Sequence, residues 1–423
     1  MNSRERVLAA LNHQQPDRVP FDLGSTAITG IHALALYRLR QARNLPEKPI
    51  KIHEIFQQLG FIEPDDAEAL HIDVFGIIPY RNFCGVKCTD WKPYETNYGI
   101  PALCPKDFAF TKDEATGRTY AYPQGDTTAK PSLMMPTGGY FFDNINRSPD
   151  TVDSEDLDPV RDYKDTYAVM DDEEALFYEK QADRLYQNTR FALIGNFSVA
   201  GFGDVAQLPG APLREPRGIR SMEEWIMAHK ICPEYVHGLF EYQMEVGLKN
   251  LEIYHQAVGE KICAIVMGGT DFGTQNSLMI SREDFRTFYL PYWKRVNEWV
   301  HKNTSWKTFY HSCGAVSELI PDFIEAGVDV LNPVQCSAAG MDPEMLKEKY
   351  GDKLVFWGGG MDTQKTLPFG TPDEVRQMVR DRVDIFGKGG GFIFDAIHNI
   401  QGNAPVENIA AMLDELDLIR GLK

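Results

Sequence analysis

The second half of the sequence alternates between short apolar segments and longer amphipathic segments, and this alternation limits the fold more than any other feature. The helical segments begin with capping signals, such as Asp342 before Pro343 and Thr371 before Pro372. The apolar segments are continuous runs, as expected for strands that are buried on both faces. They lie at 261–269, 306–311, 328–335, 354–360 and 390–396. This pattern predicts a parallel α/β sheet.

Three further apolar segments, at 19–24, 71–78 and 191–197, bring the number of predicted strands to eight. Eight strands alternating with helices are typical of a (β/α)8 barrel of the TIM type. Residues 80–190 do not follow the alternation and are rich in proline, glycine and aromatic residues. We therefore expect an α/β protein with one barrel over residues 1–423 and a β-rich insertion, a lid or shoulder, at 80–190.

Composition excludes several classes of function. The chain of 423 residues has 43 basic and 61 acidic side chains and a net charge of −18, which argues against binding to nucleic acid or to an anionic membrane surface. No apolar run approaches the roughly 20 residues that cross a bilayer. The first residues carry charges where a signal peptide is apolar, and the seven cysteines are scattered. These features predict a cytoplasmic protein.

The segment "WKTFYHSCGAV" places His311 and Cys313 at the end of a predicted strand. In an extended chain, residues i and i+2 point to the same face, and barrel active sites lie at the carboxyl ends of the strands. Imidazole nitrogen and thiolate sulfur are common zinc ligands, and a catalytic zinc keeps one open position. A zinc site here needs a third ligand from another strand, for which His398 and Cys336 are the candidates.

Other polar side chains follow the predicted strands and are expected at the same barrel mouth. We take Asp271 as the candidate catalytic or orienting carboxylate, because it lies in the glycine-rich loop "GGTDFGTQ", where backbone can approach a ligand closely. Capping of a turn is the alternative role for this residue. The candidate substrate-binding residues are Asn196, Gln275, Gln335, Asp362 and Asp395.

The chain resembles the uroporphyrinogen decarboxylase superfamily along most of its length outside 80–190. The resemblance rests on "SRERVLAALNHQQPDRVPF", "GGTDFGTQNSLMISREDFRTFYLPYWKRV", "HSCGAVSELIPDFIEAGVDVLNPVQ", "FWGGGMDTQ" and "AIHNIQGNAPVENI". It implies a distorted (β/α)8 barrel with its site at the carboxyl-terminal mouth. It also implies one of two chemistries: metal-free decarboxylation of porphyrinogens, or zinc-dependent methyl transfer to or from a corrinoid protein.

Two positions favour the methyltransferase branch. The decarboxylases carry an arginine motif directly after the first strand, where this chain reads "DLGSTAITG". The methyltransferases carry His-x-Cys where His311 and Cys313 stand, and their third zinc ligand falls at His398. That ligand is usually cysteine in the thiol-methylating members, so histidine here favours an oxygen donor as substrate.

The sequence therefore predicts a zinc-dependent methyltransferase that moves a methyl group between a small methylated substrate and a separate corrinoid protein. O-demethylation of a methoxylated compound is the favoured reaction. The chain lacks the D-x-H-x-x-G pattern of a corrinoid-binding domain, so the corrinoid is expected on a partner protein, and a homodimer is compatible with this assignment. The alternatives are a metal-free decarboxylase of a carboxylated substrate and a non-catalytic module that binds tetrapyrroles or a corrinoid protein.

Overall fold

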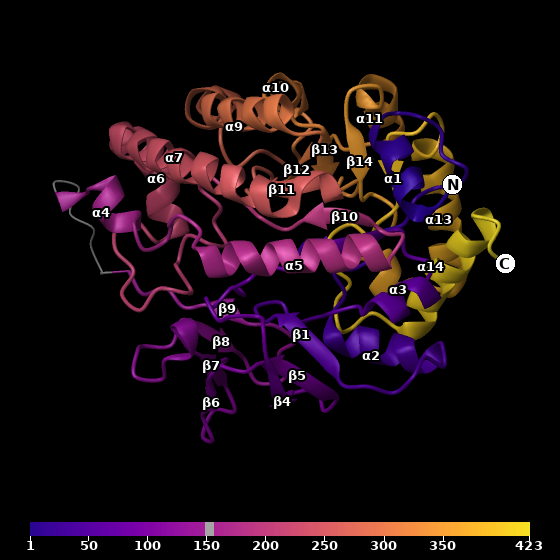
Figure 1. Ribbon diagram of the computed structural model, residues 1–423, viewed down its shortest axis with the longest axis horizontal. Helices are drawn as coiled ribbons and strands as arrows, with labels where there is room; N and C mark the ends of the chain where they lie inside the picture. Colours follow the sequence, from indigo (N-terminus) through magenta and orange to yellow (C-terminus); the bar gives the residue numbers. More distant parts are fainter. Residues whose placement is uncertain (149–155) are drawn as a thin grey trace.

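A seven-stranded parallel sheet forms the centre of the molecule (Figure 1). The computed structural model describes residues 1–148 and 156–423. The strands are ordered β15-β14-β13-β12-β11-β10-β3, so six consecutive strands of the chain lie side by side. Their bounds are β3 (Val74–Ile77), β10 (Ala192–Gly195), β11 (Ile262–Gly268), β12 (Lys307–His311), β13 (Val330–Asn332), β14 (Val355–Trp357) and β15 (Phe392–Ile393).

The two edges of this sheet both reach the segment at residues 20–22. Phe21 forms a parallel bridge with Phe394, directly after β15, and its carbonyl accepts a hydrogen bond from the Asp73 backbone N–H, directly before β3, at 2.8 Å. The predicted strand at 19–24 is thus present as one bridged residue, because the chain turns at Asp22, whose carboxylate accepts from Ser25. The sheet curls as a TIM-type barrel does, which confirms the predicted fold class.

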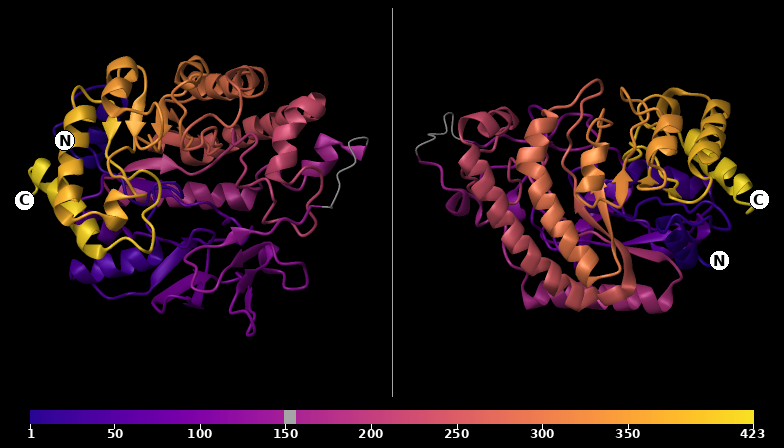
Figure 2. Two further views of the ribbon diagram at one scale, coloured as in Figure 1. Left: turned by 180° about the vertical axis from the view of Figure 1, so that it is seen from behind. Right: turned by 90° about the horizontal axis from the view of Figure 1, so that it is seen from above.

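Helices lie on the outer side of the curled sheet (Figure 2). The predicted caps are confirmed at α11, where Asp342 accepts from the Met345 N–H, and at α13, where Thr371 and Glu374 form a capping box. The larger helices are α1 (Ser3–Leu11), α2 (Ala33–Ala42), α5 (Asp172–Asn188), α6 (Met222–Ile231), α7 (Pro233–Val258), α9 (Leu290–Asn303), α11 (Pro343–Tyr350), α13 (Pro372–Phe386) and α14 (Val406–Ile419). The shorter ones are α3 (Pro64–Ala69), α4 (Pro159–Tyr163), α8 (Arg282–Asp284), α10 (Ile320–Glu325) and α12 (Thr366–Phe369).

The helical segment after β11 is interrupted. Ser281 caps α8, but Phe285–Tyr289 form a π-helical turn before α9 begins. Pro291 lies in the first turn of α9 and has no backbone N–H to donate. None of the helices in the described ranges is long and apolar enough to cross a membrane.

Two small sheets lie together on one side of the barrel sheet, at the bottom of Figure 1. One has the order β2-β1-β5-β4 and the other β6-β7-β8-β9. Their strands are β1 (Ile50–Glu54), β2 (Leu59–Gly60), β4 (Trp91–Glu95), β5 (Pro101–Pro105), β6 (Phe110–Lys112), β7 (Thr119–Ala121), β8 (Leu133–Met135) and β9 (Asp143–Asn144). These sheets thus include strands before residue 80, whereas α5, inside 80–190, packs against α7. The insertion at 80–190 as one unit stays a prediction.

Candidate metal centre

A polar layer lies directly above an apolar layer inside the barrel. The apolar layer belongs to one buried cluster that includes Phe309, Val330, Trp357 and Ile393. Because side chains two residues apart along a strand face the same side, the next inward layer holds a different set of residues, all at most 3% exposed: His311, Asn332 and Asp395. Buried polar groups need partners, so this layer is where the barrel can meet a ligand.

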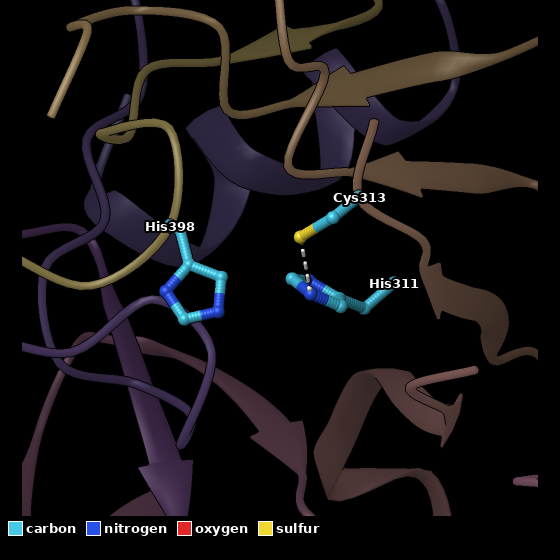
Figure 3. A group of neighbouring side chains, drawn as sticks. All are labelled: His311, Cys313 and His398. Carbon is cyan, nitrogen blue, oxygen red and sulfur yellow. Dashed lines mark hydrogen bonds between the residues drawn. The ribbon is translucent and has the colours of Figure 1, made fainter. Parts of the chain in front are cut away.

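His311 of this layer lies close to Cys313 and His398 (Figure 3). The Cys313 sulfur lies 3.2 Å from His311 Nε2, and one potential ligand atom from each of the three residues lies within 4.8 Å of the others. His311 ends β12, Cys313 follows it, and His398 comes from the loop after β15. Two imidazole nitrogens and one thiolate sulfur are a donor set that suits zinc and leaves a fourth tetrahedral position open.

Asn332 fixes the tautomer of His311. The Asn332 amide donates to the Trp357 carbonyl at 2.8 Å, so its oxygen faces His311 Nδ1, at 2.5 Å. Since an amide oxygen only accepts, His311 Nδ1 carries the proton and the Nε2 lone pair is directed toward Cys313. This is the arrangement by which a carbonyl oxygen orients a metal-binding histidine.

His398 is held in an unusual backbone conformation with φ of +67°. Non-glycine residues rarely adopt this region, and such strain concentrates at functional sites. Burial, with a contribution from nearby His311, lowers the pKa of His398 to about 3. The ring is therefore neutral at pH 7, which is the form that binds metals. Its Nδ1 accepts from the Asn399 backbone N–H at 2.8 Å, and Nε2 faces the other two residues (Figure 3). In this tautomer Nε2 carries the ring proton, which must leave Nε2 before that nitrogen can bind a metal.

Cys313 is fixed through its backbone. Its N–H donates to Asp271 Oδ1 at 2.7 Å, and the next residue, Gly314, has φ of +86° and lies against the backbone of Gly273. A Cβ at Gly314 would lie 2.3 Å from the Gly273 carbonyl oxygen, so only glycine fits. Burial and the neighbouring Asp271 carboxylate raise the pKa of the Cys313 thiol well above its usual value. A bound cation would oppose this shift and stabilise the thiolate.

Asp271 lies at the edge of the cluster. Its Oδ1 is 3.8 Å from His311 Nε2, and its side chain is 36% exposed. One carboxylate oxygen thus contacts both the Cys313 backbone and the neighbourhood of the imidazole. This placement gives Asp271 an orienting role and keeps it in reach of a molecule at the mouth; its catalytic role stays a prediction.

Gln275 and Gln335 connect the loops around Cys313. Gln335 accepts from the Gly314 N–H at 2.8 Å and donates to the Gln275 side chain at 3.0 Å. Gln275 in turn donates to the Ser337 carbonyl at 2.5 Å. Both amides therefore hold three loops together, and their predicted contact with substrate stays a prediction.

Two other predicted binding residues make contacts within the chain. Asn196 donates to the carbonyls of Ser25 and Ile77, which joins the ends of β10 and β3 to the first loop. The Asp362 carboxylate accepts from three successive backbone N–H groups at 364–366, as a cap before α12. Substrate binding by either residue stays a prediction.

Cys336 points its thiol at the Val334 carbonyl, 3.3 Å away. Among the described residues, the cluster with metal-binding geometry contains His398 and not Cys336. The geometry therefore favours His398 over Cys336 as the third ligand.

Sequence reasoning missed Asn332 and Asp204 near this centre, and it assigned no role to Asp22. Asn332 was not recognised because it lies within the apolar run "VDVLNPVQ", although its spacing of two residues from Val330 directs it inward. The Asp22 carboxylate accepts from the Trp357 indole N–H at 2.9 Å, a contact that no local pattern signals. Asp204 lies in an irregular loop, where burial, with Asp271 contributing, raises its pKa to about 7.

Known proteins resemble this chain over its second half in sequence and over its whole length in fold. The sequence model of the uroporphyrinogen decarboxylase (URO-D) family matches residues 211–417, which include all three clustered residues. A curated uroporphyrinogen decarboxylase from Psychromonas ingrahamii is 34% identical over 83 residues, which span 19% of this chain and only 23% of the relative. Among solved structures, a methyltransferase from Methanosarcina mazei aligns over 99% of both chains with a TM-score of 0.56 and 16% identity.

The structural likeness, at 16% identity, shows the fold. The segment at 211–417 contains β11 to β15, with both histidines and the cysteine of the cluster. Over this segment the chain is similar to the uroporphyrinogen decarboxylase family.

Proposed function

We propose that this protein is a zinc-dependent methyltransferase that moves a methyl group between a small methylated substrate and a separate corrinoid protein. The observation that carries the proposal is the convergence of His311, Cys313 and His398 at the carboxyl ends of the barrel strands. A decarboxylase without a metal has no need of a thiol beside two imidazoles. The solved structure that aligns over the whole chain is also titled a methyltransferase, which supports the same assignment.

The residues of the site fit a zinc ion that binds the heteroatom of the substrate. Asn332 keeps the Nε2 lone pair of His311 free, and burial keeps His398 neutral. Zinc would act there as a Lewis acid that makes a substrate oxygen a better leaving group. Asp271 holds the Cys313 backbone in place, so the sulfur stays beside the imidazole.

The favoured reaction is O-demethylation of a methoxylated compound. The methyl–oxygen bond breaks, and the oxygen keeps the bonding electron pair and gains a proton. The methyl group passes to the reduced corrinoid of the partner, which supplies the electron pair of the new bond. Two histidines and one cysteine carry less negative charge than one histidine and two cysteines, and so leave a stronger Lewis acid for an oxygen leaving group. The corrinoid partner and a cytoplasmic setting are part of this proposal; all seven cysteines are free thiols.

Metal-free decarboxylation is the second candidate, because the family sequence model and the curated relative are both named for it. A substrate with many carboxylates needs arginines at the mouth. The loop after the first bridged strand, "DLGSTAITG", contains no arginine, and the protein carries a net charge of −18. These features favour methyl transfer.

Metal content decides between the two candidates. Purified protein should hold about one zinc per chain, and Cys313→Ala should lose it while the far-ultraviolet circular dichroism stays unchanged. Cys336→Ala is the matched control, since its thiol lies outside the cluster, and should keep the zinc.

Activity is then tested with a methoxylated phenol and reduced cobalamin. Zinc-loaded protein should release the free phenol and methylate the cobalamin, and Cys313→Ala should do neither. Full zinc in Cys313→Ala, or release of carbon dioxide from a porphyrinogen by metal-free protein, would overturn the proposal.

A further inference from the structure

Asp22 and Asp395 form a pair of buried carboxyl groups, each directly after the bridge between Phe21 and Phe394. Asp22 is fully buried and Asp395 is 1% exposed. Asp395 follows β15 by two residues and faces inward in the same layer as His311. Asp22 comes from the segment that lies between β15 and β3. The charge of Asp22 acts on Asp395.

The two carboxyl groups differ in their hydrogen bonds. Asp22 is well supplied: Ser25 donates its hydroxyl at 2.6 Å and its backbone N–H at 3.2 Å, and the Trp357 indole donates at 2.9 Å. Asp395 Oδ1 accepts only from the Ala396 N–H, at 2.8 Å. Asp395 Oδ2 is buried and has no hydrogen-bond partner among the described residues.

No cation compensates this pair within the described ranges. The ion pairs found there include neither Asp22 nor Asp395, whereas the equally buried Asp73 binds Arg6 and Arg420. Two like charges in an apolar setting cannot both persist, because each unpaired buried charge costs several kcal/mol. At least one carboxyl group must therefore keep its proton. Asp22 receives three hydrogen bonds that stabilise a negative charge, so the proton belongs to Asp395.

We propose that Asp395 is a neutral carboxylic acid that gives its Oδ2 proton to the oxygen that leaves in methyl transfer. The step is balanced: the Oδ2–H bond breaks, the departing oxygen gains the proton, and Asp395 is left as a carboxylate that water at the mouth reprotonates. The role rests on the proposed function for the identity of that oxygen. It also defines the substrate class as one with a hydrogen-bond-accepting oxygen at the reacting end, and it disfavours methylammonium compounds.

Burial and the charge of Asp22 both favour the protonated form of Asp395. Burial, followed by the neighbouring Asp22, raises the pKa of Asp395 well above its usual value. The pKa of Asp22 rises only to about 6 through burial, which its hydrogen bonds to Ser25 and Trp357 oppose. Environments that separate the pKa values of two carboxyl groups are the usual way to obtain an acid at neutral pH.

The protonation of Asp395 can be measured without any substrate. The infrared spectrum of the intact protein at pH 7 should contain a carbonyl band of a protonated carboxyl group that disappears in Asp395→Asn. Asp322→Asn is the matched control: Asp322 is also fully buried but is paired with Arg282 and Arg286, so its removal should leave the band unchanged. No loss of the band in Asp395→Asn would overturn the proposal.

Two further measurements cover the remaining outcomes. In D2O the band should shift immediately, because an acid that is reprotonated in every turnover must exchange its proton with water; a shift that takes hours would mean an enclosed structural acid and would reject the catalytic role. If Asp395→Asn does not fold, Asp22→Asn replaces it: removing the neighbouring carboxylate should move the band, and an unmoved band would reject the pair. Failure of zinc binding with the band present would reject the proposed function alone.

Discussion

Asn332 offers the sharpest test of how the barrel prepares its metal centre. Replacing Asn332 by alanine removes the acceptor for His311 Nδ1–H and the donor for the Trp357 carbonyl. Each buried polar group left without a partner costs about 1–3 kcal/mol, so the loss of partners for two groups should lower the free energy of unfolding by about 2–6 kcal/mol. His311 is then free to exchange tautomers, and in one of them Nε2 carries the proton and cannot bind metal.

The zinc affinity of the folded Asn332→Ala protein should therefore also fall, in addition to the loss of stability. Loss of such an outer hydrogen bond costs about 10–100-fold in metal affinity, or roughly 1.4–2.7 kcal/mol. The assay is competition for zinc between the folded protein and a chromophoric chelator. Asn332→Asp keeps an acceptor for His311 and should restore most of the affinity.

Asn408→Ala provides the control for a purely structural loss. Asn408 lies on α14 and is buried. Its side chain donates to the carbonyls of Leu367 and Gly370, both at 2.8 Å. It should lower stability by a similar amount and leave the zinc affinity unchanged. If Asn332→Ala binds zinc like the unmodified protein, or if Asn408→Ala weakens zinc binding equally, the amide has no special role at the metal centre.

Three more outcomes follow from the contacts described. Gly314→Ala should displace the Cys313 loop and lower zinc occupancy, measured by metal analysis, since its Cβ would lie 2.3 Å from a backbone oxygen; normal occupancy would show that the loop adapts. Zinc affinity should rise about tenfold per pH unit near neutrality, because binding releases the proton of the Cys313 thiol; chelator competition at two pH values would show a flat profile if the thiol is not a ligand. Burial lowers the pKa of His32 to about 4, so the unfolded chain binds a proton there between pH 6.5 and 4 and the folded chain does not. The free energy of unfolding should accordingly decrease by up to about 3 kcal/mol as the pH is lowered from 6.5 to 4. Urea titration should show a smaller decrease for His32→Asn.

The barrel could be predicted because its signals are local. Each strand from β10 to β15 is an apolar run, and caps such as Asp342 mark the helices between them. The two small sheets were harder to predict because their strand pairings join distant segments. Ile50 of β1 lies beside Ala102 of β5, and neither segment contains a pattern that identifies the other. The π-helical turn before Pro291 likewise depends on packing that a helical pattern does not reveal.

At the site, the sequence identifies residues that carry chemistry but not the contacts that occupy them. His311 and Cys313 could be grouped because strand geometry fixes their relative direction. The Asp362 carboxylate, by contrast, accepts from the N–H groups of its own loop, and only the folded backbone shows this. The proposed role of Asp395 depends on its surroundings, above all on the absence of a paired cation among the described residues. No sequence pattern reveals such an environment.

The order in which the chain contributes the clustered residues has a consequence for biosynthesis. His311 and Cys313 are made well before His398, and the loop of His398 is positioned only when β15 has paired with β14 and Phe394 has met Phe21. A nascent chain on the ribosome therefore offers at most two of the three donors. Under the proposed function, tight metal binding therefore requires the completed barrel.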